Sequence, residues 1–203
     1  MRGLRFAYRQ AKAGRVIMLV DSTDLLNKRH LYENERDDLW LTNYPSITDT
    51  ELSFDSIIVY SPSHRKIDLQ NPLIFNVVVI SYGNGVPVSL NAVLNYDRNA
   101  GETEGKRQVV VSVVDVPCIS KVPGRLRDYL MENRVDALVF ADVCKSGISM
   151  PLGGMAVQLQ NEGLLHSKRW KVVGAAPTYN PLGNTVTFLN SEDVLSAINE
   201  VIS

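Results

Sequence analysis

The chain has 203 residues, enough for one domain with a sizeable hydrophobic core. Its 45% hydrophobic residues are typical of a globular protein, and a formal net charge of −1 excludes strong attraction of the whole surface to nucleic acid. Two cysteines and three scattered histidines exclude a disulfide framework and a zinc site of ordinary ligand spacing. We therefore expect a cytoplasmic protein in a reducing, intracellular compartment, with no metal and no other cofactor.

The N-terminal segment 1–15, MRGLRFAYRQAKAGR, carries five basic residues and no acid. This pattern predicts a solvent-exposed helix or a segment that leads into a strand. The alternatives are a basic arm that binds nucleic acid or an anionic membrane, and an organelle-targeting segment. The acidic cluster at 33–38 can offset this charge within the same fold. No apolar run is long enough to cross a bilayer and the N-terminus lacks an apolar signal core, so no transmembrane segment or signal peptide is predicted.

Strand-like runs rich in Val and Ile recur along the chain, and most are continuously apolar, as in strands buried on both faces. They lie at 15–20, 56–60, 75–80, 108–114, 137–140, 171–176 and 185–189. Helices are predicted between them, with capping residues or glycine stops at their ends. The helical candidates are 24–33, 121–133, 153–165 and 192–202.

The order of these elements after residue 107 alternates between strand and helix, which favours a largely parallel sheet. We predict a single α/β domain over 1–203, with a mostly parallel sheet of about six strands and flanking helices. Residues 77–97 fit either a strand, loop and helix or a hairpin that turns at 83–85. Ligands of open α/β sheets bind beyond the carboxyl ends of the strands, which is where residues 141–149 are expected.

The segment DALVFADVCKSGISM at 136–150 holds the candidate site. One interpretation is only a strand end with turn residues, in which Cys144 is a small core residue. The other interpretations are a cysteine nucleophile and a phosphate-binding turn.

FADVCKSG resembles the cysteine block of the caspase–legumain clan of peptidases, and strand–helix–strand 108–141 precedes it as in those folds. The resemblance implies that Cys144 is the nucleophile and that a histidine activates it. The His-Gly pair that ends the preceding strand in that clan is replaced here by Asp115 and Val116. His64 is therefore the candidate base, in a chain order that differs from the family's.

ALVFADVCKSGIS also resembles the ribose-phosphate loop of phosphoribosyltransferases, and VVVISYGNGVPVSLNAVL resembles the pyrophosphate loop and helix of that family. The resemblance implies a ligand site at Asp142, Ser146, Gly147 and Ser149. In such a site, backbone N–H groups at the start of a helix bind the phosphate. Ala141 and Lys145 depart from the family's pattern.

Two classes of function remain open at this point. The first is an enzyme, either a caspase-like cysteine hydrolase, with an inactive relative as its variant, or a phosphoribosyltransferase-like phosphate or nucleotide binder. The second is a non-catalytic interaction or assembly protein, such as a viral structural protein, that binds a protein partner or forms a homo-oligomer. The spatial neighbours of the Cys144 sulfur are expected to separate the two.

Overall fold

The computed structural model describes residues 2–18, 25, 30, 46, 52–60, 73–99, 108–147, 149–179 and 187–203. The chain divides into two compact units, Met1–Asp55 and Ser56–Ser203, which are described separately. The larger unit is an α/β domain with a mostly parallel sheet, which confirms the predicted fold class. The predicted extent of that domain, 1–203, stays a prediction.

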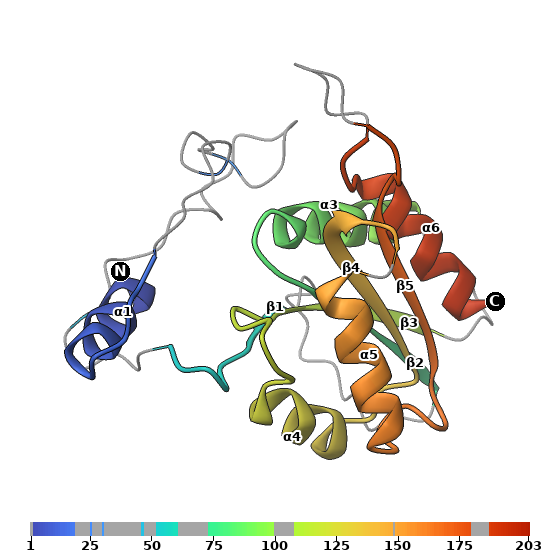
Figure 1. Ribbon diagram of the computed structural model, residues 1–203. Coiled ribbons are helices and arrows are strands. Elements are labelled where there is room, and N and C mark those ends of the chain that lie inside the picture. Colours follow the sequence, from blue (N-terminus) through green and yellow to red (C-terminus); the bar gives the residue numbers. More distant parts are fainter. Residues whose placement is uncertain are drawn as a thin grey trace. The chain divides into compact units, whose positions relative to one another are not determined.

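The described part of the larger unit holds a five-stranded sheet in the order β1-β3-β2-β4-β5. Its strands are β1 (Ile58–Tyr60), β2 (Ile74–Ser81), β3 (Gln108–Asp115), β4 (Ala137–Lys145) and β5 (Arg169–Ala175). Its helices are α3 (Gly85–Asn99), α4 (Gly124–Glu132), α5 (Pro151–Asn161) and α6 (Ser191–Ile202). Figure 1 shows their arrangement.

Four strands of the sheet run parallel, and β1 alone pairs antiparallel, with β3. In the register, Ile80 of β2 lies beside Val114 of β3 and beside Phe140 of β4. The three strand-like runs at 108–114, 137–140 and 171–176 thus belong to one parallel arrangement, as predicted. β2 is the central strand, because it separates β3 from β4.

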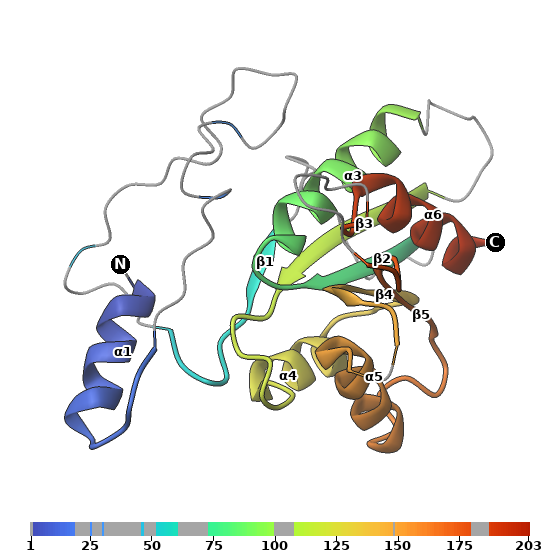
Figure 2. The same cartoon turned by 45° about the horizontal axis from the view of Figure 1, so that its top comes forward.

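Helices cover both faces of the sheet: α3 and α6 lie on one side, and α4 and α5 lie on the other (Figure 2). On the α4/α5 side, Ile80, Leu138 and Phe140 of the sheet pack with Leu126 of α4 and Leu159 of α5. Because side chains alternate along a strand, Val77, Val79 and Val139 point to the α3/α6 side, and they are fully buried. The continuous Val/Ile runs of the sequence follow from this two-sided burial.

The last helix, α6, begins at a capping box. The Asn190 side chain accepts a hydrogen bond from the Asp193 N–H, and the Asp193 carboxylate accepts one from the Asn190 N–H. Its buried stripe contains Val194, Ile198 and Val201. This helix therefore starts and packs as its sequence predicts.

Several predicted elements differ in detail from the structure. The sheet has five strands among the described residues, where about six were predicted. Residues 187–189, the described part of the predicted strand 185–189, are not in a strand. The region after β2 is a loop and a helix, so the alternative hairpin at 83–85 is wrong. The predicted helix at 24–33 lies almost wholly outside the described residues.

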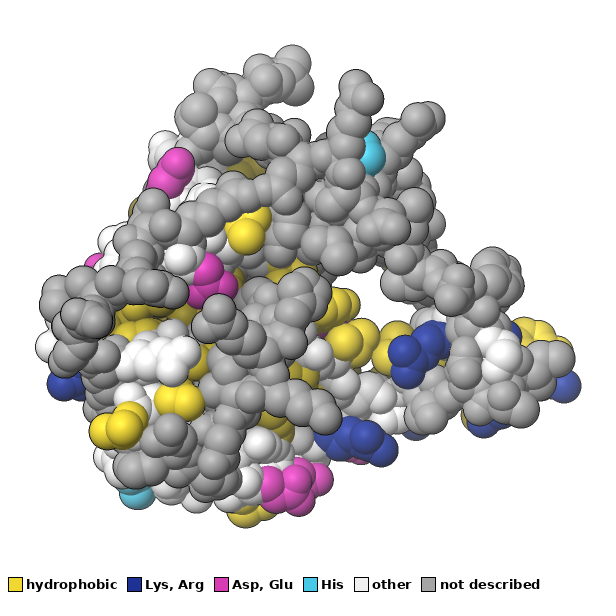
Figure 3. Space-filling model, turned by 180° about the vertical axis from the view of Figure 1, so that it is seen from behind, with side chains coloured by type: hydrophobic (Ala, Val, Ile, Leu, Met, Phe, Trp, Pro, Cys, Tyr) yellow, Lys and Arg dark blue, Asp and Glu magenta, His cyan; other side chains and the backbone are white. Residues whose placement is uncertain are grey.

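The surface of the molecule carries apolar side chains as well as polar ones. Figure 3 shows them from behind, among charged and polar groups. In the larger unit, Leu73, Met131 and Val157 are among the exposed ones. Single exposed apolar side chains are normal on soluble domains, so by themselves they indicate no interface.

The smaller unit contains α1 (Arg2–Lys12), whose four basic residues recur at spacings of three and four and so share one face of the helix. Phe6 packs edge-on against Phe54, with ring centroids 4.9 Å apart, and the Arg15 guanidinium lies over the Phe54 ring. A nucleic acid or anionic membrane partner for this segment stays a prediction. None of the helices in the described ranges is long and apolar enough to span a membrane.

Candidate functional site

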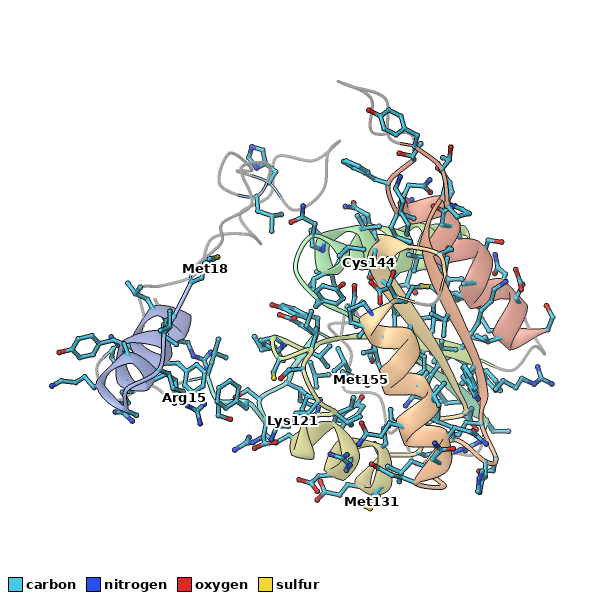
Figure 4. The ribbon with its side chains drawn as sticks, in the orientation of Figure 1. Arg15, Met18, Lys121, Met131, Cys144 and Met155 are labelled. Carbon is cyan, nitrogen blue, oxygen red and sulfur yellow. The ribbon has the colours of Figure 1, made fainter. Side chains whose placement is uncertain are left out.

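The carboxyl edge of the sheet contains a switch point between β2 and β4. From β2 the chain crosses to β3 on one side, and from β3 it returns to β4 on the other side. α3 follows β2 and α5 follows β4, and the two helices leave the gap between these strand ends toward opposite faces of the sheet. Open α/β sheets bind ligands at such a gap. Figure 4 shows Cys144 at the end of β4, near the start of α5.

Asp142 is the centre of a polar cluster at this switch point, and its side chain is fully buried. Its Oδ1 atom accepts hydrogen bonds from the Tyr82 hydroxyl and from the Cys144 N–H, each at 2.9 Å. Its Oδ2 atom accepts one from the Leu152 N–H at 2.8 Å. All three donors are close and well placed, so both oxygens of the carboxylate are in use.

Asp142 also caps a helix that begins nine residues later. Met150 occupies the N-cap position of α5 but makes no side-chain capping bond, and Pro151 has no N–H. The Leu152 N–H is thus the first amide of the helix that needs an acceptor, and Asp142 supplies it. A carboxylate at this position also interacts favourably with the helix dipole.

Tyr82 follows the last residue of β2 and reaches both Asp142 and Cys144. Its hydroxyl lies 2.9 Å from Asp142 Oδ1 and 3.5 Å from Cys144 Sγ. Burial raises the pKa of Tyr82 above the ordinary value for a phenol, and the hydrogen bonds to Cys144 and Asp142 raise it further. Tyr82 is therefore a neutral donor at physiological pH.

The Cys144 thiol lies beside this phenol and is partly exposed. A phenol has one proton, and Tyr82 gives it to the nearer acceptor, Asp142. The contact between Cys144 and Tyr82 then has the thiol as donor and the phenol oxygen as acceptor. Within the described part of the chain, no histidine has a hydrogen bond to Cys144.

Two glycines allow the close packing around this edge. A Cβ atom on Gly85, the first residue of α3, would lie 2.2 Å from Ser81 Oγ and 3.0 Å from Val143 Cγ1. Ser81 Oγ is itself fixed, because it donates to the Ala141 carbonyl at 2.8 Å. A Cβ on Gly174 of β5 would lie 2.8 Å from the Cys144 carbonyl oxygen. Neither position has room for a side chain.

The turn after β4 differs from the predicted phosphate loop. No helix opens at Ser146 and Gly147, because α5 begins only at Pro151. The Ser146 N–H donates to the Ala175 carbonyl at 2.8 Å, and the Leu152 N–H donates to Asp142. Ser146, Gly147 and Ser149 are exposed. The Ser146 and Leu152 amides therefore already have acceptors within the chain, and ligand binding by Ser146, Gly147 and Ser149 stays a prediction.

The place expected for a catalytic histidine also changes with the strand order. The strand that precedes Cys144 in sequence is β3, but the strand beside β4 in the sheet is β2. The residue next to Cys144 is thus Tyr82, whereas Asp115 and Val116 lie one strand further away. His64, the candidate base, is outside the described residues. Its role, and that of Cys144 as a nucleophile, stay predictions.

Asp115 ends β3 at the same edge of the sheet but on the other face. Its neighbours Val114 and Val116 belong to the core beside α4 and α5, so Asp115 points toward the α3/α6 side. Burial raises the pKa of its carboxyl to about 6. Among the described residues, no three His, Cys, Asp or Glu side chains cluster in a way that could hold a metal ion.

Sequence reasoning singled out Asp142 and Cys144 but assigned no role to Tyr82. One signal could have found it: Tyr82 comes directly after a buried strand, as Asp142 ends another. That signal is incomplete without the strand order, because carboxyl-end residues meet only if their strands are neighbours.

No protein-family model matches the chain, and neither does any curated protein. One solved structure is similar, with a TM-score of 0.52 and 16% sequence identity. It is described as "Split gene transketolase, inactive beta4 tetramer", where beta4 is the subunit composition of that protein. The match covers 76% of this chain and 43% of that one, so this chain spans less than half its length. At this identity the likeness shows the α/β fold alone.

Proposed function

We propose that this protein is a non-catalytic α/β interaction or assembly module. We also propose that the polar cluster around Asp142, which includes Tyr82 and Cys144, is structural. One observation carries the proposal: both oxygens of Asp142 are occupied by Tyr82, Cys144 and Leu152. A carboxylate that caps a helix, orders a strand end and is fully buried is not exposed to a substrate. The cluster holds β2, β4 and α5 together at the switch point.

The cysteine hydrolase alternative requires a base that takes the thiol proton and returns it to the leaving group. Tyr82 does not meet this requirement, because its pKa is raised and its proton is already donated to Asp142. His64 is the remaining candidate. The inactive-relative version of the caspase-like hypothesis needs no base, and it agrees with the proposal.

The experiment is iodoacetamide labelling of the native protein across pH, with Cys144 and Cys118 read separately by mass spectrometry. Both cysteines are partly exposed, so Cys118 is an internal control. We expect Cys144 to react no faster than Cys118 below about pH 8, the range in which ordinary thiols are mainly protonated. Fast labelling of Cys144 near pH 6 that is lost in His64→Ala would contradict the proposal and establish a cysteine–histidine pair.

The phosphoribosyltransferase-like alternative is tested with phosphoribosyl pyrophosphate and magnesium in a thermal shift assay. Ligand at 100 times its dissociation constant stabilises a protein by about 2.7 kcal/mol, a readily measured shift. We expect no shift, because the Ser146 and Leu152 amides have acceptors within the chain. A shift that disappears in Ser146→Pro, which removes one of these amides, would support a phosphate site instead.

A further inference from the structure

Among the described residues, no strand pairs with β5 on the side away from β4, so this side of β5 has backbone groups without a strand partner. The Arg169 N–H donates to the Asp136 carbonyl, and the Ala175 carbonyl accepts from the Ser146 N–H, so the odd-numbered residues face β4. Backbone groups alternate along a strand, and those of Trp170, Val172 and Gly174 therefore point outward. None of them has a hydrogen bond to another described residue outside the sheet.

The backbone N–H groups just before and just after these three residues already have acceptors within the chain. Beyond one end, the Lys168 N–H donates to the Leu165 carbonyl at 3.1 Å. Beyond the other end, the Ala176 N–H donates to the Thr187 carbonyl at 3.0 Å. The open groups are thus limited to three alternate residues, and Val172 lies at their centre.

We propose that a second copy of this chain pairs with this edge, β5 against β5 in antiparallel orientation, about a two-fold axis at Val172. In this register Trp170 faces Gly174 of the second copy, and Val172 faces Val172. Every outward N–H and C=O of the three residues then has a partner. The proposal rests on the proposed function, since it names the partner of the interaction module.

The side chains of β5 favour this register over its neighbours. Lys171 faces Val173 of the second copy and Arg169 faces Ala175, so no two cations oppose each other. A shift of the register toward the N-terminus would set Lys171 against Lys171, and like charges directly opposite are destabilising. A shift toward the C-terminus would need the Ala176 N–H, which Thr187 already holds.

The edge lacks the features by which proteins usually block such pairing. It contains no proline, and its cations are directed to α6: Arg169 donates to the Val201 and Ile202 carbonyls, and Lys171 pairs with Glu200. Trp170 is 37% exposed although its ring packs edge-on against Phe140. At the opposite end of the sheet, β1 is only three residues long, which is a common protective feature.

Two variants test the pairing in the full chain by light scattering and oxidative cross-linking. Val172→Pro removes an outward N–H and leaves the bonds to β4, a position where edge strands tolerate proline. The unmodified chain should have twice the mass of one chain, and Val172→Pro should have the mass of one, with an unchanged circular dichroism spectrum.

Val172→Cys, in a background with Cys118 and Cys144 replaced by serine, should form a disulfide across the two-fold axis. Directly opposite residues of a hydrogen-bonded pair are about 5.5 Å apart, within the range that a disulfide bridges. Val59→Cys on β1, at the other end of the sheet, is the matched control and should not cross-link.

A monomer at all protein concentrations, or a dimer whose Val172→Cys variant does not cross-link, would overturn the pairing. If Val172→Pro fails to fold, the cysteine pair still decides. These results are separate from the labelling of Cys144: a reactive Cys144 in a cross-linked dimer would contradict the proposed function and leave the pairing, and an unreactive Cys144 in a monomer would do the reverse.

Discussion

The carboxylate of Asp142 and the backbone N–H of Leu152 are joined by a 2.8 Å hydrogen bond that ties the end of β4 to the first turn of α5. The same carboxylate holds Tyr82, which follows β2. A single buried side chain therefore fixes two strands and a helix at the switch point.

Replacement of Asp142 by Asn should lower the free energy of unfolding by about 2–4 kcal/mol, because a buried amide cannot accept from all three donors and its own NH2 lacks an acceptor. Urea denaturation measures the change. Asp128→Asn, on the exposed face of α4, is the control and should alter stability by less than about 0.5 kcal/mol. Equal effects of the two variants would mean that Asp142 does not cap α5.

Tyr82→Phe should cost less than Asp142→Asn, about 1–2 kcal/mol, because Oδ1 of Asp142 keeps its bond from the Cys144 N–H. The two substitutions act on one hydrogen bond, so the double variant should be more stable than the sum of the single effects predicts. A double-mutant cycle in urea should give a coupling energy of about 1 kcal/mol. Strict additivity would show that the two side chains do not interact in solution.

Gly85→Ala and Gly154→Ala should shift stability in opposite directions. The new methyl group at Gly85 meets Ser81 Oγ and Val143, which should destabilise the domain by about 1–3 kcal/mol. The one at Gly154, in the exposed part of α5, meets no atom within 4 Å, and it should stabilise the helix by about 0.5–1 kcal/mol. Thermal denaturation of both variants checks the prediction. A stable Gly85→Ala variant would contradict the close approach of α3 to the sheet.

Asp115 should make the domain less stable as the pH rises from about 4 to about 6. Its pKa is raised to about 6 by burial, so in this window the folded state binds more protons than the unfolded state. The free energy of unfolding then falls with rising pH, and the fall ends once the folded carboxyl has ionised. Asp115→Asn should remove this slope and raise stability at neutral pH by about 1–3 kcal/mol. Urea midpoints at several pH values, with Asp128→Asn as control, decide the point.

Much of the architecture could be predicted from the sequence. The continuous runs at 75–80 and 137–140 required strands with two covered faces, since half-exposed strands would alternate. Helical stripes such as Val194, Ile198 and Val201 required helices on those faces. Parallel pairing followed, because strands joined by crossover helices run in the same direction. These inferences depend on local periodicity, which a single chain displays directly.

The neighbours of Cys144 depended on the tertiary structure. Tyr82 and Asp142 are sixty residues apart, and the same alternation of strands and helices allows β3, instead of β2, to lie beside β4. The start of α5 could not be predicted from the sequence either, because its cap comes from Asp142 on a strand and not from the residue before the helix. The open edge of β5 also follows from strand order. Periodicities that act within a few residues are visible in the amino-acid order, and they identify the buried strands and the helices. Which strand ends meet, and which edge stays open, was decided only when side chains far apart in the chain packed into one core.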